Sequence, residues 1–308
     1  MSQAASEPQG LSWPSIARLG LVQAAIGAVV VLMTSTLNRV MVVELGLLAA
    51  IPGLLVGVHF AVQILRPRMG FGSDRDGRRI TWIIGGMGLT SLSGLGAAAA
   101  TAWMTTSPRM GLAAAVVAFF LLGVGVSAGS TPFLAYMAER VPERRMAGAA
   151  ALTWILMIAG IIVTATVAGS FLDPYSPTRL VQVAFGVTGG AFLLTLIGVA
   201  GRSGSEPIHL RSSESSAPFK EVLDAMWADP QSRAFATFIF LSMLAYSAQD
   251  IILEPYAGAV FGLTPGESTK IAGLQHGGVL LGMIAGAVGA ARWGTLPRWA
   301  AAGCAASA

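Results

Sequence analysis

The chain has 308 residues, of which 54% are hydrophobic and only 11% are charged, and its formal net charge is +4. Soluble domains carry about 25% charged residues, so this composition and a mean hydropathy of +0.69 exclude a soluble globular protein and indicate a polytopic membrane protein. The single cysteine, Cys304, excludes an intramolecular disulfide framework and a metal site with several cysteine ligands.

Eight segments are apolar and long enough to cross a bilayer, which takes about 20 helical residues. They lie at 16–43, 47–65, 80–103, 110–137, 146–171, 180–201, 233–261 and 271–291. A further apolar segment begins at Trp299 and runs to the last residue. We therefore expect an all-α, polytopic transmembrane helical bundle with eight spans and the start of a ninth, and we interpret the sequence as truncated.

One long polar stretch, at 202–232, separates the sixth span from the seventh. It is rich in Ser, Glu and Pro and includes a short amphipathic piece with Phe219, Val222, Leu223, Met226 and Trp227. The chain is therefore predicted to consist of a six-helix half at 1–201, a cytoplasmic central loop at 202–232 and a partial second half at 233–308.

The basic residues predict the orientation of these spans. With the N-terminus in the cytoplasm, 15 of the 19 lysines and arginines fall in inner loops and 3 in outer loops, and Arg39 lies within the first span. Inner loops of membrane proteins carry an excess of Lys and Arg. We therefore predict a protein of the bacterial inner membrane with a cytoplasmic N-terminus. The same distribution explains the basic pI of about 9.7 without a nucleic-acid partner.

A basic, glycine-containing pattern joins the second and third spans. It is defined by Gly70, Asp74, Arg75, Gly77, Arg78 and Arg79. The glycines suit a tight turn, Asp74 suits a helix cap or an arginine partner, and the arginines suit the headgroup region. A solvated basic loop is the alternative, but it does not account for the Gly-Asp-Gly spacing. The pattern resembles the short cytoplasmic loop of major facilitator superfamily transporters, which implies that fold but no particular substrate.

Polar residues inside membrane spans are costly and mark functional candidates. Two groups occur, in the first and the seventh spans: Asn38, Arg39 and Glu44, and Gln249, Asp250 and Glu254. We expect Arg39 and Asp250 to form a buried pair between the two halves. The alternative is that the long side chains reach the outer headgroups, and for Glu44 we favour that interpretation.

The segments around these two groups, L-N-R-V-M-V-V-E-L-G at 37–46 and A-Q-D-I-I-L-E-P-Y-A-G at 248–258, closely resemble stretches of the PucC/LhaA family. The resemblance extends from about Leu11 to the end of the chain. It implies a protein of the inner or intracytoplasmic photosynthetic membrane that assists light-harvesting complex assembly. It further implies that the protein binds or delivers bacteriochlorophyll. The partners implied are membrane lipids, antenna subunits and bacteriochlorophyll synthesis enzymes.

Pigment binding calls for an apolar cleft and an axial ligand for magnesium, commonly an imidazole. His59 lies in the second span one helical turn before Gln63, with Leu55 and Phe60 as expected apolar walls, and His276 lies beside two glycines. A histidine that is hydrogen-bonded within the bundle is the alternative for both.

No nucleophile–base pair, paired carboxylates or metal-ligand cluster stands out in the sequence, so we predict neither an enzyme nor a metal site. The competing functional interpretation is a proton-coupled secondary transporter of a small solute. In that case Asp250 or Glu254 would be the group that is protonated.

Overall fold

The computed structural model describes residues 10–172, 175–202 and 219–261, then 275, 277–286, 288–289, 292 and 296–307. Only the backbone is described at 143–144, 147, 219, 222, 246–259, 296–297 and 307. The chain divides into two compact units, Met1–Pro207 and Ile208–Ala308. This boundary falls within the polar stretch at 202–232, and the three-part division stays a prediction.

The first unit is helical throughout its regular structure. Its elements are α1 (Trp13–Val31), η1 (Leu32–Leu37), η2 (Val40–Glu44), α2 (Ala50–Val62), η3 (Gln63–Leu65), α3 (Arg66–Asp76), α4 (Arg79–Trp103), α5 (Pro108–Arg140), α6 (Glu143–Phe171) and α7 (Pro177–Val199). They form six helical stretches that are long and apolar enough to cross a membrane: Trp13–Glu44, Ala50–Asp76, Arg79–Trp103, Pro108–Arg140, Gly148–Phe171 and Pro177–Val199. The predicted all-α class is therefore confirmed, and no strand occurs in the described part of the chain. The first six predicted spans coincide with helices that are long and apolar enough to cross a membrane.

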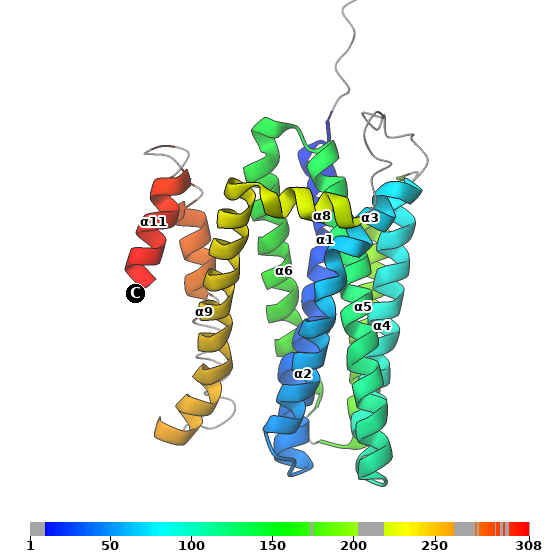
Figure 1. Cartoon of the computed structure of the whole chain (residues 1–308). Coiled ribbons are helices and arrows are strands. Elements are labelled where there is room, and N and C mark those ends of the chain that lie inside the picture. The colour runs from blue at the N-terminus through cyan, green and yellow to red at the C-terminus, as the bar shows by residue number, and fades with distance from the viewer. Residues whose placement is uncertain are drawn as a thin grey trace, which may run out of the picture. The chain divides into compact units, whose positions relative to one another are not determined.

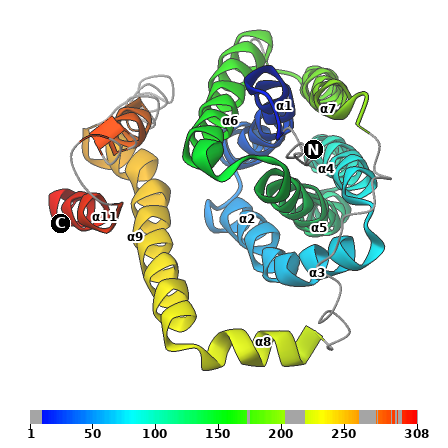
Figure 2. The same cartoon turned by 90° about the horizontal axis from the view of Figure 1, so that it is seen from above.

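The spans pack side by side in one bundle, with α1 between α6 and α7, as the view along the bundle shows (Figure 2). α1 contacts α6 and α7, α4 contacts α5 and α7, and α2 contacts α5. Small residues set the closest approaches: a Cβ on Gly86 of α4 would collide with the backbone of Gly129 in α5, and one on Gly160 of α6 with that of Ala24 in α1. The hydrophobic effect does not drive helices together within lipid, so close packing of their backbones stabilises the bundle instead.

Arginines join the helix ends at one end of this bundle. The Leu11 backbone N–H donates to the Arg140 carbonyl at 3.0 Å, and the Arg145 guanidinium donates to the Leu11 carbonyl at 3.1 Å. Arg18 donates to the carbonyl of Ala200 at 2.6 Å. These contacts bring the start of α1, the α5–α6 turn and the end of α7 together. The bonds to Arg140 and Ala200 also satisfy carbonyls that the ends of α5 and α7 leave free.

The first span is interrupted by two π-helical segments. η1 begins directly after α1, and η2 follows across the short link at Asn38 and Arg39. Gly46, with φ of 63°, ends the irregular stretch. π-helical turns are rare and occur often at functional sites, so this break singles out the outer half of the first span.

The pattern at 70–79, predicted as a loop, is mostly helical. A 3₁₀ turn at Gln63–Leu65 redirects the chain, and α3 then runs across one end of the bundle as far as Asp76 (Figure 2). The turn itself is confined to Gly77, with φ of 63°, and the residue after it. The remaining glycines serve packing, because a Cβ on Gly70 would lie 3.2 Å from Thr131 of α5.

The second unit contains α8 (Phe219–Ala228), α9 (Pro230–Phe261), a shorter apolar helix at Gly277–Gly286 and α11 (Leu296–Ser307) (Figure 1). α9 covers the predicted seventh span. The predicted eighth span, at 271–291, lies partly outside the described residues.

The six-span unit leads to a prediction about orientation. Reporter fusions at Arg75 and Ser213 should show a cytoplasmic location, and fusions at Ser107 and Gly266 a periplasmic one, because the arginine-rich end of the bundle should face the cytoplasm. A periplasmic signal at Ser213 would contradict an even number of spans before the central loop.

Candidate functional site

Arg79 forms the most connected polar group of the first unit. Its guanidinium is buried at the start of α4, with 7% of the side chain exposed, and its Nη1 lies 2.6 Å from Oδ1 of Asp74 in α3. Its Nε donates to Oε2 of Glu139 in α5 at 3.1 Å, and its Nη2 donates to the other oxygen of the same carboxylate. Such two-pronged arginine–carboxylate pairs are among the stronger hydrogen bonds in proteins, so this cluster joins α3, α4 and α5.

This geometry differs in part from what the sequence suggests. Asp74 pairs with an arginine, one of the two roles expected of it, and Arg75 and Arg78 are exposed at the end of the bundle. Arg79, expected among the headgroups, is instead buried because two carboxylates neutralise it. Glu139 is not among the residues predicted from the sequence. The signal that could have identified it is a carboxylate in the last turn of the fourth span, at the same end as the basic pattern.

His59 is the second buried polar group. Only 2% of the residue is exposed. Its Nε2 lies 2.9 Å from Nε2 of Gln63, so the Gln63 amide donates and the ring hydrogen is assigned to Nδ1. In the described part of the chain, Nδ1 has no hydrogen-bond partner. The Phe60 ring lies 5.0 Å away, edge to face. The two polar residues therefore face the same side of the second span, as their spacing predicts.

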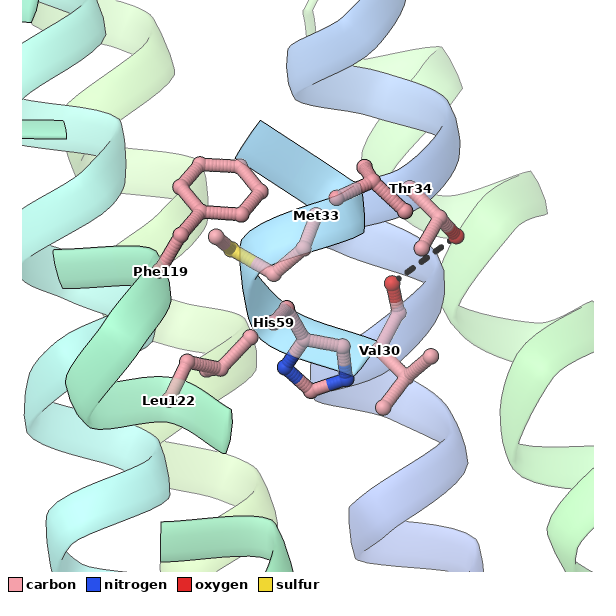
Figure 3. Close-up of a pocket in the computed structure, with 7 residues that line it drawn as sticks. Val30, Met33, Thr34, His59, Phe119 and Leu122 are labelled. Atoms are coloured by element: carbon pink, nitrogen blue, oxygen red, sulfur yellow. Dashed lines mark hydrogen bonds between the residues drawn. The ribbon is translucent and has the colours of Figure 1, made fainter. Parts of the chain in front are cut away.

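A small cavity, too tight to hold a water molecule, lies beside this histidine between the first, second and fourth spans (Figure 3). It is lined by Val30, Met33, Thr34, Val56, His59, Phe119 and Leu122. Thr34 directs its hydroxyl to the Val30 carbonyl at 3.0 Å. The expected walls are not found there: Leu55 is buried in the core instead, and Phe60 is largely exposed. Other helices supply the walls, which sequence proximity does not reveal.

A bacteriochlorophyll macrocycle does not fit beside His59. Sites for drug-sized ligands occupy about 300–1,000 Å³, whereas the cavity beside His59 has no room even for a water molecule. One ring nitrogen is engaged by Gln63, and the ring is closed to ligands from outside. The geometry therefore favours a structural histidine in this conformation. The other histidine candidate, His276, lies outside the described residues.

The polar group of the first span lies at the opposite end from the arginine cluster. Asn38 is partly buried between the two π segments, and Arg39 and Glu44 are exposed. Tyr175, in the link before α7, packs against the core, and burial together with the nearby Glu44 carboxylate raises the pKa of its phenol. The side chains of Gln249, Asp250 and Glu254 lie outside the described residues, so the Arg39–Asp250 pair stays a prediction.

Comparison with known proteins gives clear relatives. Residues 36–308 match the family model described as PUCC protein. The chain is 48% identical over 299 residues to the bacteriochlorophyll synthase 44.5 kDa chain of Rhodobacter capsulatus, covering 96% of this chain and 69% of the relative. It is 33% identical to Protein PucC of the same organism, and the match covers 90% of this chain and 63% of the relative. It is 28% identical to Protein PucC of Rhodovulum sulfidophilum, and that match covers 91% of this chain and 65% of the relative. No solved structure matches significantly.

The arginine cluster should couple α4 to α5 energetically. Glu139→Gln should lower the free energy of unfolding by roughly 2 kcal/mol, below the 3–5 kcal/mol of a fully buried pair, because the Glu139 side chain is 35% exposed to screening solvent. Arg79→Met should cost a similar amount. The double variant should lose clearly less than the sum in detergent unfolding measurements. Additive losses would show that the two side chains do not interact.

His59 should stabilise the bundle through its hydrogen bond to Gln63. His59→Leu leaves the Gln63 amide without this partner inside the bundle, so unfolding stability should fall by about 1–2 kcal/mol. His59→Leu combined with Gln63→Leu should recover part of that loss, measured by thermal unfolding in detergent. A double variant that is no more stable than His59→Leu alone would contradict this pairing.

Proposed function

The chain belongs to the PUCC protein family, and we propose that it assists the assembly of photosynthetic light-harvesting complexes in the membrane. The family match over residues 36–308 carries this proposal. The bacteriochlorophyll synthase 44.5 kDa chain, 48% identical, links a near relative to the pigment by name. The chain spans 60–69% of the lengths of the relatives it matches, so the activity of a whole family member is part of the proposal.

Bacteriochlorophyll enters this proposal as cargo, handled together with the antenna subunits that receive it. The cavity beside His59 is too small for the macrocycle, which favours contact on the outer faces of the spans. These faces carry large exposed apolar side chains: Leu54 and Ile64 in the second span, Ile162, Val163 and Phe171 in α6, and Phe185, Leu193 and Ile197 in α7. Lipid covers such faces in any membrane protein, so they permit contact with an apolar partner without identifying it.

We regard the chain as a non-catalytic assembly factor. The printed name of one relative describes a chain of a synthase, but the sequence offers no nucleophile–base arrangement. The described residues contain no group of three or more His, Cys, Asp or Glu side chains suited to a metal. We propose bacteriochlorophyll synthesis enzymes as partners of the chain, alongside membrane lipids and antenna subunits.

The first unit is proposed to be one half of a major facilitator fold in the inner or intracytoplasmic membrane. Six spans in one compact unit support this, as does the turn at Gly77 between the second and third spans. The Arg79 cluster, which ties that turn to the fourth span, adds to the support.

Removing the chain from its source bacterium should lower the long-wavelength antenna absorbance of the membranes, while extractable bacteriochlorophyll falls much less. The physical reason is that pigment would still be made but not built into antenna complexes. Re-expressed wild type should restore the bands. Cys304→Ser should restore them equally, because this exposed residue belongs to none of the clusters described.

Two outcomes would contradict the proposal. Accumulation of pigment precursors with proportional loss of all bacteriochlorophyll would place the chain in synthesis instead. Unchanged antenna bands, together with solute uptake by the purified chain in vesicles driven by a proton gradient, would favour the secondary transporter.

A further inference from the structure

α8 is a strongly amphipathic helix. Leu223, Met226 and Trp227 are spaced three and four residues apart and share one face of the helix. The acidic residues Glu221 and Asp224 fall on the other side, and Lys220 lies at the boundary, seven residues before Trp227. The helix has ten residues, about 15 Å in length, and is therefore too short to cross a bilayer of about 30 Å.

The apolar face of α8 is uncovered in the described part of the chain. Leu223 is 44% exposed, Met226 58% and Trp227 59%. Leaving three large apolar side chains in water on one short helix is unfavourable. A helix with a wide apolar face, a charged opposite face and a Trp at the boundary is typical of segments that lie in the lipid interface.

A single residue fixes α8 to the start of α9. The Asp229 backbone N–H donates to the Ala225 carbonyl of α8 at 3.3 Å, and its carbonyl accepts from the Arg233 N–H of α9 at 3.0 Å. Its carboxylate accepts from the backbone N–H and the hydroxyl of Ser232 at 2.9 and 2.6 Å, and these bonds hold the pKa of Asp229 below its ordinary value. Asp229 thus ends one helix and caps the next.

This joint sets the direction of α8. Figure 1 shows α8 running across the axis of α9. α9 is a 32-residue helix rich in large apolar side chains, and we expect it to span the membrane with Arg233 near its cytoplasmic end. A helix attached crosswise to that end through one residue lies at the membrane surface.

We propose that α8 is a membrane-surface helix, seated in the lipid interface at the start of α9, with Leu223, Met226 and Trp227 in the lipid. The helix carries one basic and two acidic side chains and so offers no attraction to anionic headgroups. Apolar contact therefore holds it in place. Attachment should depend little on salt or on the anionic lipid content, in contrast to the arginine-rich end of the first unit.

The test uses the whole chain with Cys304→Ser and one new cysteine, either Leu223→Cys or the matched control Glu221→Cys. Each is labelled with an environment-sensitive fluorophore and reconstituted in phosphatidylcholine vesicles. Nitroxide-labelled lipid should quench the probe at 223 at least about threefold more than the probe at 221, and aqueous iodide should show the reverse preference, because only one face enters the interface. Met226→Cys and Asp224→Cys form a second pair in case the first folds poorly.

Three results would overturn the proposal. Equal iodide quenching at both positions would place α8 in water. Protection of position 223 from both quenchers would mean that protein, not lipid, covers the apolar face. Loss of the lipid quenching at high salt would show that charge holds the helix in place. None of these readouts depends on antenna assembly, so failure here and failure of the proposed function are distinguishable.

Discussion

Burying a charged guanidinium inside a membrane bundle is costly unless carboxylates pair with it, and this requirement organises one end of the first unit. Arg79 begins α4, and its partners come from the helix before it and from the end of α5. The distance between the second and third spans is thereby fixed, and α3 has to lie across the end of the bundle to bring Asp74 within reach. The two-residue turn at Gly77 follows from the same geometry.

Arginines at the same end also join distant segments of the chain. Arg18 donates to the carbonyl of Ala200 at the end of α7, and Arg145 donates to that of Leu11 before α1. The distribution that predicts orientation therefore also supplies donors for backbone carbonyls outside the helices. A count of basic residues in loops captures the first role and misses the second, because the second depends on which helix ends meet.

The parts of the fold that follow from local composition could be predicted from the sequence. An apolar run of about 20 residues has few alternatives to a spanning helix, so the first six spans were found with small errors at their ends. The pattern at 70–79 predicts a loop because it lies between two apolar segments and its glycines suit a tight turn. In the structure those glycines allow α3 to approach α5, a packing effect between distant segments. Glu139 and the walls around His59 were missed for the same reason, since each comes from another span.

The geometry around His59 bears on the proposed role of the chain in handling bacteriochlorophyll. An interior site for a macrocycle would need a cavity of several hundred Å³ between the spans. Instead, α1, α4, α5 and α6 approach one another at glycines with no room for a Cβ. Opening such a space inside the first unit would separate those backbone contacts. A route along the outer faces leaves them intact, because the pigment and the antenna helices are themselves apolar and can replace lipid there. Under the proposed function, the packing of the unit therefore favours exchange of bacteriochlorophyll at the outer faces of the spans over its passage through the centre of the bundle.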